Sequence, residues 1–164
     1  MIEDRLSELG LTLPSPTLGD LDYYGKKYGK MKPYYRSGNL LLLSGHVAGM
    51  NNGKVLYPGV CGREITIEEG YEAARLTGLN CLAGIKEALG SLDRVAGLAR
   101  SLNFVACAPG FTEPHRVANG LTDLFANIFG DEIGIGPRAT IGVMSLADNY
   151  CFETWMTIDV KDGS

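Results

Sequence analysis

Two charged residues near the C-terminal end of the chain are the strongest candidates for chemistry. Arg138 opens a predicted strand directly after the glycine-rich loop 134–137, and its planar guanidinium suits a carboxylate better than a lysine would. Glu153 lies on a later strand, where strict alternation puts it on a partly apolar face. A carboxylate there loses hydration and becomes a better proton acceptor. A surface arginine and a solvated edge-strand glutamate remain open alternatives.

The other residue types that often carry chemistry form no recognisable site. His46 and His115 are the only histidines, and two isolated imidazoles make neither a zinc site nor a convincing triad. The four cysteines lack a C-x-x-C pair, so we expect reduced, mostly core residues. The loop 134–137 lacks the G-x-G-x-x-G order and precedes a strand, not a helix. We therefore expect no nucleotide cofactor and no metal.

Size and composition indicate one folded domain spanning residues 1–164. The chain is 45% hydrophobic and 21% charged, which is typical of a folded globular protein. A net charge of −4 offers no field that would attract phosphate backbones, so nucleic acid is not an expected partner. The chain contains no run of roughly 18 apolar residues and no signal-peptide pattern, which predicts a cytoplasmic protein without a membrane partner.

A segment rich in tyrosine, glycine and lysine, residues 22–35, has two interpretations. Interleaved basic and aromatic side chains between Tyr23 and Lys30 could form a nucleic-acid patch. We favour an irregular arm that lies over a subunit edge.

Periodicity and capping signals predict the elements that must position these residues. Thr66 and Glu69 form a capping box at the start of a long helix, and Gly90 stands at its C-cap. Pro114 begins a second helix that stops at Gly130. The predicted strands are 34–37, 40–47, the end of 95–106, 138–146 and 151–160, and a short helix covers 2–9. This order predicts an α+β fold with a mainly antiparallel sheet and two helices packed on one face. The other face of the sheet would stay exposed to water unless another subunit covered it, so we expect oligomers.

Several segments together resemble the Rid family, also called YjgF-like or reactive intermediate deaminases. The resemblance covers roughly residues 31–160, which form the core, with 1–30 as an N-terminal extension. It depends on the order and spacing of 37–45, Asn80 in the long helix, 91–95, 117–120, 137–143 and Phe152-Glu153.

The resemblance implies a chorismate-mutase-like fold with a mainly antiparallel six-stranded sheet, and a barrel-like homotrimer with sites in the clefts between subunits. It places a substrate-carboxylate arginine at Arg138 and a water-activating glutamate at Glu153. The further candidate substrate-binding residues are Ser44, Gly45, Asn119, Tyr35 and His46. Met31 stands where the best-known deaminase branch carries a cleft tyrosine, which indicates a divergent subgroup with its own substrate.

The activity implied by the resemblance is a cofactor-free hydrolysis of enamine or imine acids, such as 2-aminoacrylate, to 2-keto acids and ammonia. A non-catalytic trimer that binds a small carboxylate or a partner protein is the main alternative. Endoribonuclease activity, a label used in the family, is disfavoured by the acidic charge and by the lack of a paired-histidine site.

Overall fold

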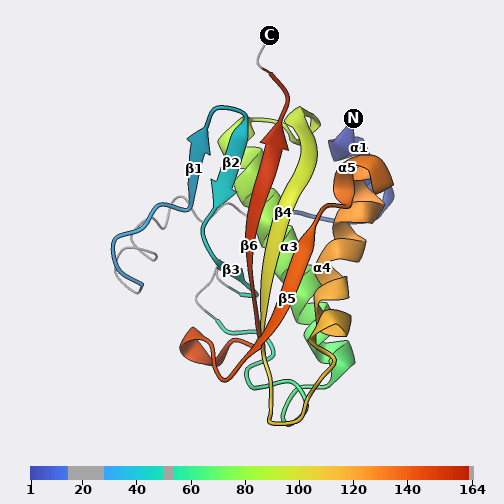
Figure 1. Cartoon of the computed structure of the whole chain (residues 1–164). Helices are drawn as coiled ribbons and strands as arrows, with labels where there is room; N and C mark the ends of the chain where they lie inside the picture. Colours follow the sequence, from blue (N-terminus) through green and yellow to red (C-terminus); the bar gives the residue numbers. More distant parts are fainter. Residues whose placement is uncertain (15–27, 50–53, 163–164) are drawn as a thin grey trace.

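The computed structural model describes residues 1–14, 28–49 and 54–162, so residues 22–27 of the tyrosine- and lysine-rich segment lie outside the described residues. A twisted sheet forms one layer, and helices form a second layer behind it (Figure 1). The strands are β1 (Tyr34–Ser37), β2 (Leu40–Leu43), β3 (His46–Val47), β4 (Val95–Ala106), β5 (Arg138–Val143) and β6 (Phe152–Val160). The helices are α1 (Ile2–Glu8), α3 (Ile67–Leu89), α4 (Pro114–Phe129) and α5 (Asp131–Gly134). None of the helices in these described ranges is long and apolar enough to cross a membrane.

The six-stranded sheet is mixed, because one parallel pair of strands joins a mainly antiparallel arrangement. Its strand order is β1-β2-β6-β4-β5, with β3 also paired to β6. All pairs are antiparallel except β4 and β5, which run parallel. The parallel pair arises because α4 carries the chain back along the sheet before β5 begins, as in other crossover connections. The final two strands therefore flank β4 and do not form a hairpin.

The long helix forms where its end signals predicted. The Thr66 hydroxyl accepts a bond from the Glu69 amide at 3.1 Å, and the Glu69 carboxylate accepts one from the Thr66 amide at 2.9 Å. Gly90 ends the helix in the left-handed region at φ 81°, which a residue without a Cβ adopts at little cost. The capping box and the Gly90 C-cap are both confirmed.

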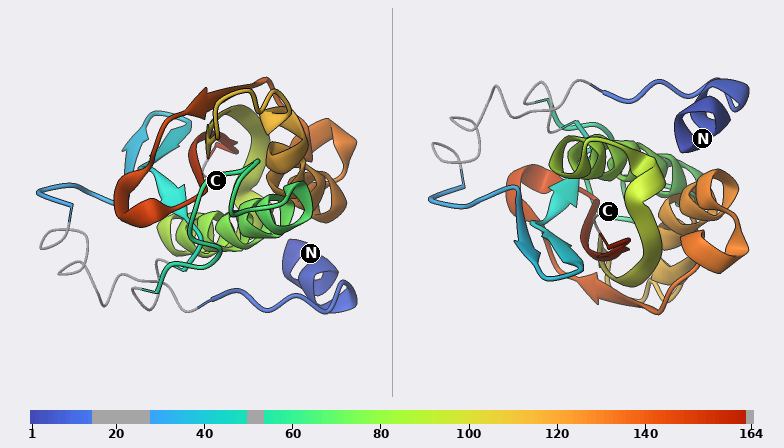
Figure 2. Two further views of the ribbon diagram at one scale, coloured as in Figure 1. Left: turned by 90° about the horizontal axis from the view of Figure 1, so that it is seen from below. Right: turned by 90° about the horizontal axis from the view of Figure 1, so that it is seen from above.

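Both long helices cover the same face of the sheet (Figure 2). The α4 stripe Val117, Leu121 and Phe125 is almost fully buried, and Pro114 stands in the first turn as predicted. On β6, alternate side chains from Phe152 to Val160 point into this core. The core therefore lies between the helices and one side of β6 and its neighbours.

The opposite face of the sheet is open and unusually apolar. Trp155, Ile141 and Leu42 are each between 41% and 50% exposed there, although all three are large hydrophobic residues. Tyr35 lies opposite Leu42 in the register of β1 and β2, so it is on the same face. An exposed apolar patch of this kind usually marks a contact surface.

Three strand boundaries differ from the sequence expectation. The predicted strand 40–47 is split into β2 and β3, because one extra residue lies between them. Leu42 pairs with Thr157 and His46 with Thr154, so four steps along one strand match three along the other. In addition, β4 is extended over the whole of 95–106, and β5 ends at Val143.

Candidate functional site

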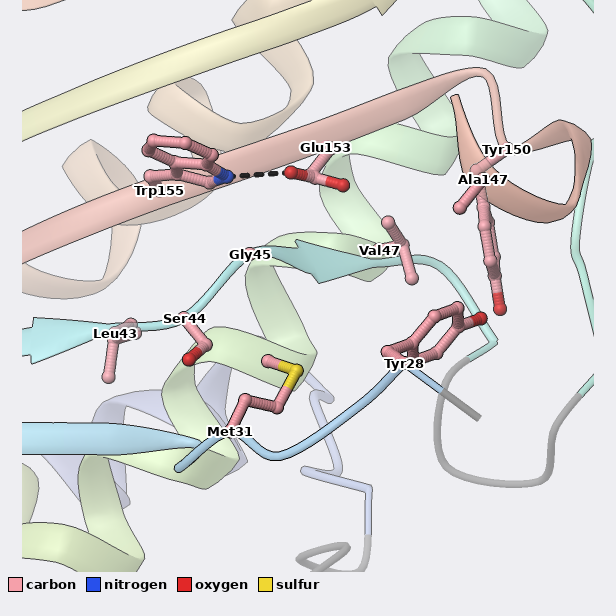
Figure 3. Close-up of a pocket in the computed structure, with 10 residues that line it drawn as sticks. All are labelled: Tyr28, Met31, Leu43, Ser44, Gly45, Val47, Ala147, Tyr150, Glu153 and Trp155. Carbon is pink, nitrogen blue, oxygen red and sulfur yellow. Dashed lines mark hydrogen bonds between the residues drawn. The ribbon is translucent and has the colours of Figure 1, made fainter. Parts of the chain in front are cut away.

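A cavity of about 440 Å³ opens beside Glu153 (Figure 3). Its wall combines β6, the break between β2 and β3, the segment before β1 and the turn before β6. The residues that line it are Tyr28, Met31, Leu43, Ser44, Gly45, Val47, Ala147, Tyr150, Glu153 and Trp155. Three of the predicted site residues, Ser44, Gly45 and Glu153, are thus brought together.

The Glu153 carboxylate is held in one position. Its Oε2 accepts a 2.6 Å hydrogen bond from the indole Nε1 of Trp155, which lies on the same face of β6 (Figure 3). A Cβ added at Gly45 would approach that oxygen to 2.7 Å and the indole nitrogen to 3.0 Å. A larger residue at this position would therefore displace the Glu153 carboxylate from its present place.

The extra residue between β2 and β3 is what brings Ser44 and Gly45 to the carboxylate. The Ser44 amide donates to the Pro33 carbonyl at 2.9 Å, and its hydroxyl donates to the Lys32 carbonyl. These two bonds tie the segment before β1, including Met31, to the cavity wall. Bulges of this kind often redirect the chain beside functional sites.

His46 supports the break from behind and does not line the cavity. Its Nδ1 donates to the Ser44 carbonyl at 2.6 Å, which assigns the proton to that nitrogen. The ring is only 4% exposed and faces α3 near Gly84. Burial lowers the pKa of His46 from its ordinary value of 6.5, and the bond to Ser44 opposes this only in part.

Arg138 lies at the edge of the sheet against α4. Its guanidinium donates to Asn119 Oδ1 at 2.9 Å and to Thr122 Oγ1 at 3.1 Å, with a longer bond to the His115 carbonyl. The structure therefore joins two further predicted site residues, Arg138 and Asn119. The side chain is exposed, so the guanidinium group remains accessible to solvent.

Within one chain, Arg138 and Glu153 do not meet. Arg138 pairs with Ser101 of β4, whereas Glu153 pairs with Phe104. Because side chains alternate along a strand, positions three residues apart point to opposite faces. The guanidinium is consequently on the helix side of the sheet edge and the carboxylate on the open face.

Tyr35 is also separate from the cavity. It is 60% exposed on the open face of β1, with the Lys32 ammonium 5.7 Å from its ring centroid. Its role in substrate binding remains a prediction.

Sequence reasoning missed six residues of the cavity wall: Tyr28, Leu43, Val47, Ala147, Tyr150 and Trp155. Trp155 could have been found, because the alternation that singles out Glu153 puts Trp155 on the same face. Tyr28 comes from the segment before β1 and Tyr150 from the turn before β6, and only the fold brings them together. The Tyr28 hydroxyl donates to Asp148 Oδ2 at 2.5 Å, which connects the segment before β1 to the turn before β6.

The cysteines are free, as predicted, and three of them are buried. Burial raises the pKa of the Cys81 thiol, which keeps it protonated and unreactive.

Comparison with known proteins assigns the class. Residues 3–152 match the family described as "YjgF/chorismate mutase-like, putative endoribonuclease". The chain belongs to this family, and the predicted resemblance to Rid proteins is confirmed.

Close relatives extend over nearly the whole chain. Protein TCP17 of Trypanosoma cruzi is 35% identical over 158 residues, which are 96% of this chain and 93% of that protein. The crystal structure of Atu1372 from Agrobacterium tumefaciens, a protein of unknown function, has 34% identity and a TM-score of 0.83 over 98% of this chain and 94% of its own. A Shewanella oneidensis protein described as a "putative endoribonuclease" has 30% identity and a TM-score of 0.86, with coverage of 98% and 99%.

Proposed function

We propose that the protein is a cofactor-free deaminase that hydrolyses 2-imino acids, or the enamines that tautomerise to them, to 2-keto acids and ammonia. The observation that carries this proposal is the fixed Glu153 carboxylate at the wall of an open cavity in a member of the YjgF family. A carboxylate with one oxygen bound to an indole keeps its other oxygen for a water molecule.

The reaction follows from the two charged groups. The Arg138 guanidinium binds the substrate carboxylate through paired charge-assisted hydrogen bonds. Glu153 takes a proton from water as the water oxygen attacks the C=N carbon, and it returns that proton to the nitrogen to give a carbinolamine. Glu153 then carries the hydroxyl proton to the amino group as the C–N bond breaks, so that ammonia leaves and the keto acid remains. Imines hydrolyse readily, so orientation and these proton transfers are sufficient help.

The site is proposed to form between subunits of a homotrimer. Two observations support this: Arg138 and Glu153 of one chain point to opposite faces, and the open face carries exposed apolar side chains such as Trp155 and Ile141. A neighbouring copy that covers this face would bring its own Arg138 to the Glu153 cavity.

The decisive test is turnover of imines made in situ by an amino-acid oxidase, measured as keto acid and ammonia release above the spontaneous rate. We expect acceleration by the full chain and a loss of at least about a hundredfold in Arg138→Ala. Arg36→Ala, which removes another exposed arginine, is the control and should keep wild-type rates. If 2-keto acids bind but no imine is turned over, the protein is a carboxylate-binding module and the deaminase proposal is wrong.

The shared site has its own test. Arg138→Ala and Glu153→Gln chains are unfolded together and refolded as mixed oligomers. Sites between subunits would include some that carry both native groups, so part of the activity should return. Mixed oligomers as inactive as either variant alone would show that one chain supplies both groups.

A further inference from the structure

The cavity beside Glu153 has a second end that the proposed chemistry does not use. The carboxylate, Ser44 and Gly45 occupy one end, and Tyr28, Val47 and Tyr150 line the other (Figure 3). A small acid bound at Glu153 would leave this second end empty.

The second end belongs to a separate apolar cluster. Val47 and Tyr150 are 8% and 2% exposed, and they pack together apart from the main core. Tyr28, Met31, Val55 and Leu146 are the partly buried hydrophobic residues that pack against them. The wall of this end is thus held by its own packing.

The turn before β6 closes the same end. Asp148 and Asn149 both have a left-handed backbone, at φ 52° and 64°, and the Asn149 carbonyl accepts a bond from Gly59 at 2.9 Å. The turn places Ala147 in the cavity wall, and the Asp148 carboxylate accepts a hydrogen bond from the Tyr28 hydroxyl. Two segments distant in sequence are therefore fixed around one space.

The size of the cavity distinguishes classes of substrate. On the scale of about 30 Å³ for one water, a volume of 440 Å³ is several times what a three-carbon acid displaces. Among the residues that the structure describes, no lysine or arginine lines this cavity, and Glu153 is its one lining carboxylate, so a charged side chain would find no opposite partner in the apolar end.

We propose that the apolar end, formed by Tyr28, Val47, Ala147 and Tyr150, is a subsite for a bulky uncharged side chain. The preferred substrates would then be imines of hydrophobic amino acids such as leucine, and not those of three-carbon acids. This inference depends on the proposed function for its reaction, but the shape of the subsite also governs binding of the product keto acids.

The test compares imines of leucine and alanine with the full chain. We expect kcat/KM for the leucine imine to be at least about tenfold higher, because each buried methylene contributes a factor of roughly ten or more. Ala147→Phe narrows the subsite and should reduce this preference to about threefold or less. Ser145→Phe, on the same exposed loop but outside the cavity lining, is the matched control and should keep the preference.

A binding measurement separates failure of the subsite from failure of the reaction. Trp155 is the only tryptophan, and it lines the cavity, so its fluorescence reports occupancy. We expect 4-methyl-2-oxopentanoate to bind at least about tenfold more tightly than pyruvate. If no imine is hydrolysed but this difference is found, the deaminase proposal fails and the subsite stands. Equal affinity, tighter binding of pyruvate, or no binding of either would overturn the subsite.

Discussion

The two faces of the sheet use the same strands for different purposes. On the helix-covered face of β6, Thr154 is fully buried and donates to Asn103 Oδ1 at 2.7 Å. On the open face, the neighbouring Glu153 is only partly buried, and its carboxylate is oriented by Trp155. Adjacent positions of one strand thus contribute to the closed core and to the cavity.

The two faces differ in the hydrogen-bond partners of their polar groups. On the covered face of β4 and β6, the Ser101, Asn103 and Thr154 side chains form hydrogen bonds with one another. The open face keeps a carboxylate beside an open cavity. We infer that substitutions on the covered face change stability, whereas substitutions on the open face change activity.

The largest expected effect is on activity and comes from the open face. Glu153→Gln keeps the size of the side chain and an oxygen that can accept from Trp155, but it removes the base. We expect kcat for imine hydrolysis to fall by at least about a hundredfold. The midpoint of urea unfolding should stay close to that of the wild type. A variant that loses stability and activity together would show that Glu153 is structural and would contradict the division between the faces.

A matched pair on β6 tests the division directly. Thr154→Val removes the donor to a buried amide oxygen, so we expect the free energy of unfolding to fall by about 1–3 kcal/mol. Thr157→Val, a partly exposed position on the open face of the same strand, should change it by about 0.5 kcal/mol or less. Urea unfolding at one pH measures both, and equal losses would contradict the comparison.

The smallest expected effect is a pH dependence of stability from His46. Because burial lowers the pKa of its folded-state imidazole, the unfolded chain binds a proton as pH falls below 6.5 while the folded chain does not. The His46 contribution is complete above pH 6.5 and is lost as pH falls toward the folded-state pKa. By pH 5.5 the loss is at most about 1.4 kcal/mol.

His46→Asn keeps a donor for the Ser44 carbonyl and removes the titration. Its unfolding free energy should change less between pH 7.5 and pH 5.5 than that of the wild type. His115→Asn, at the exposed start of α4, is the control and should follow the wild type. A pH profile identical in all three proteins would show that His46 does not resist protonation.

Local signals in the sequence determined the helices and much of the sheet. The Thr66 capping box, Gly90 and Pro114 act through neighbours in the chain, so their effect is readable without the fold. Period-two alternation likewise fixed that Glu153 and Trp155 share a face. The two-layer arrangement followed from the order of these elements, whereas the family resemblance depended on particular segments such as 37–45 and 137–143.

Only the tertiary structure decided how the segments meet. The parallel pairing of β5 with β4 and the extra residue at Ser44-Gly45 depend on contacts between distant segments, which local propensity does not encode. The same is true of the separation of Arg138 from Glu153, because it depends on their register against β4. The sequence by itself thus determined which residues could do chemistry. Strand register sets the face to which each side chain points. Long-range pairing therefore decided that one chain holds the Glu153 carboxylate in a cavity and the Arg138 guanidinium on the other face of the sheet.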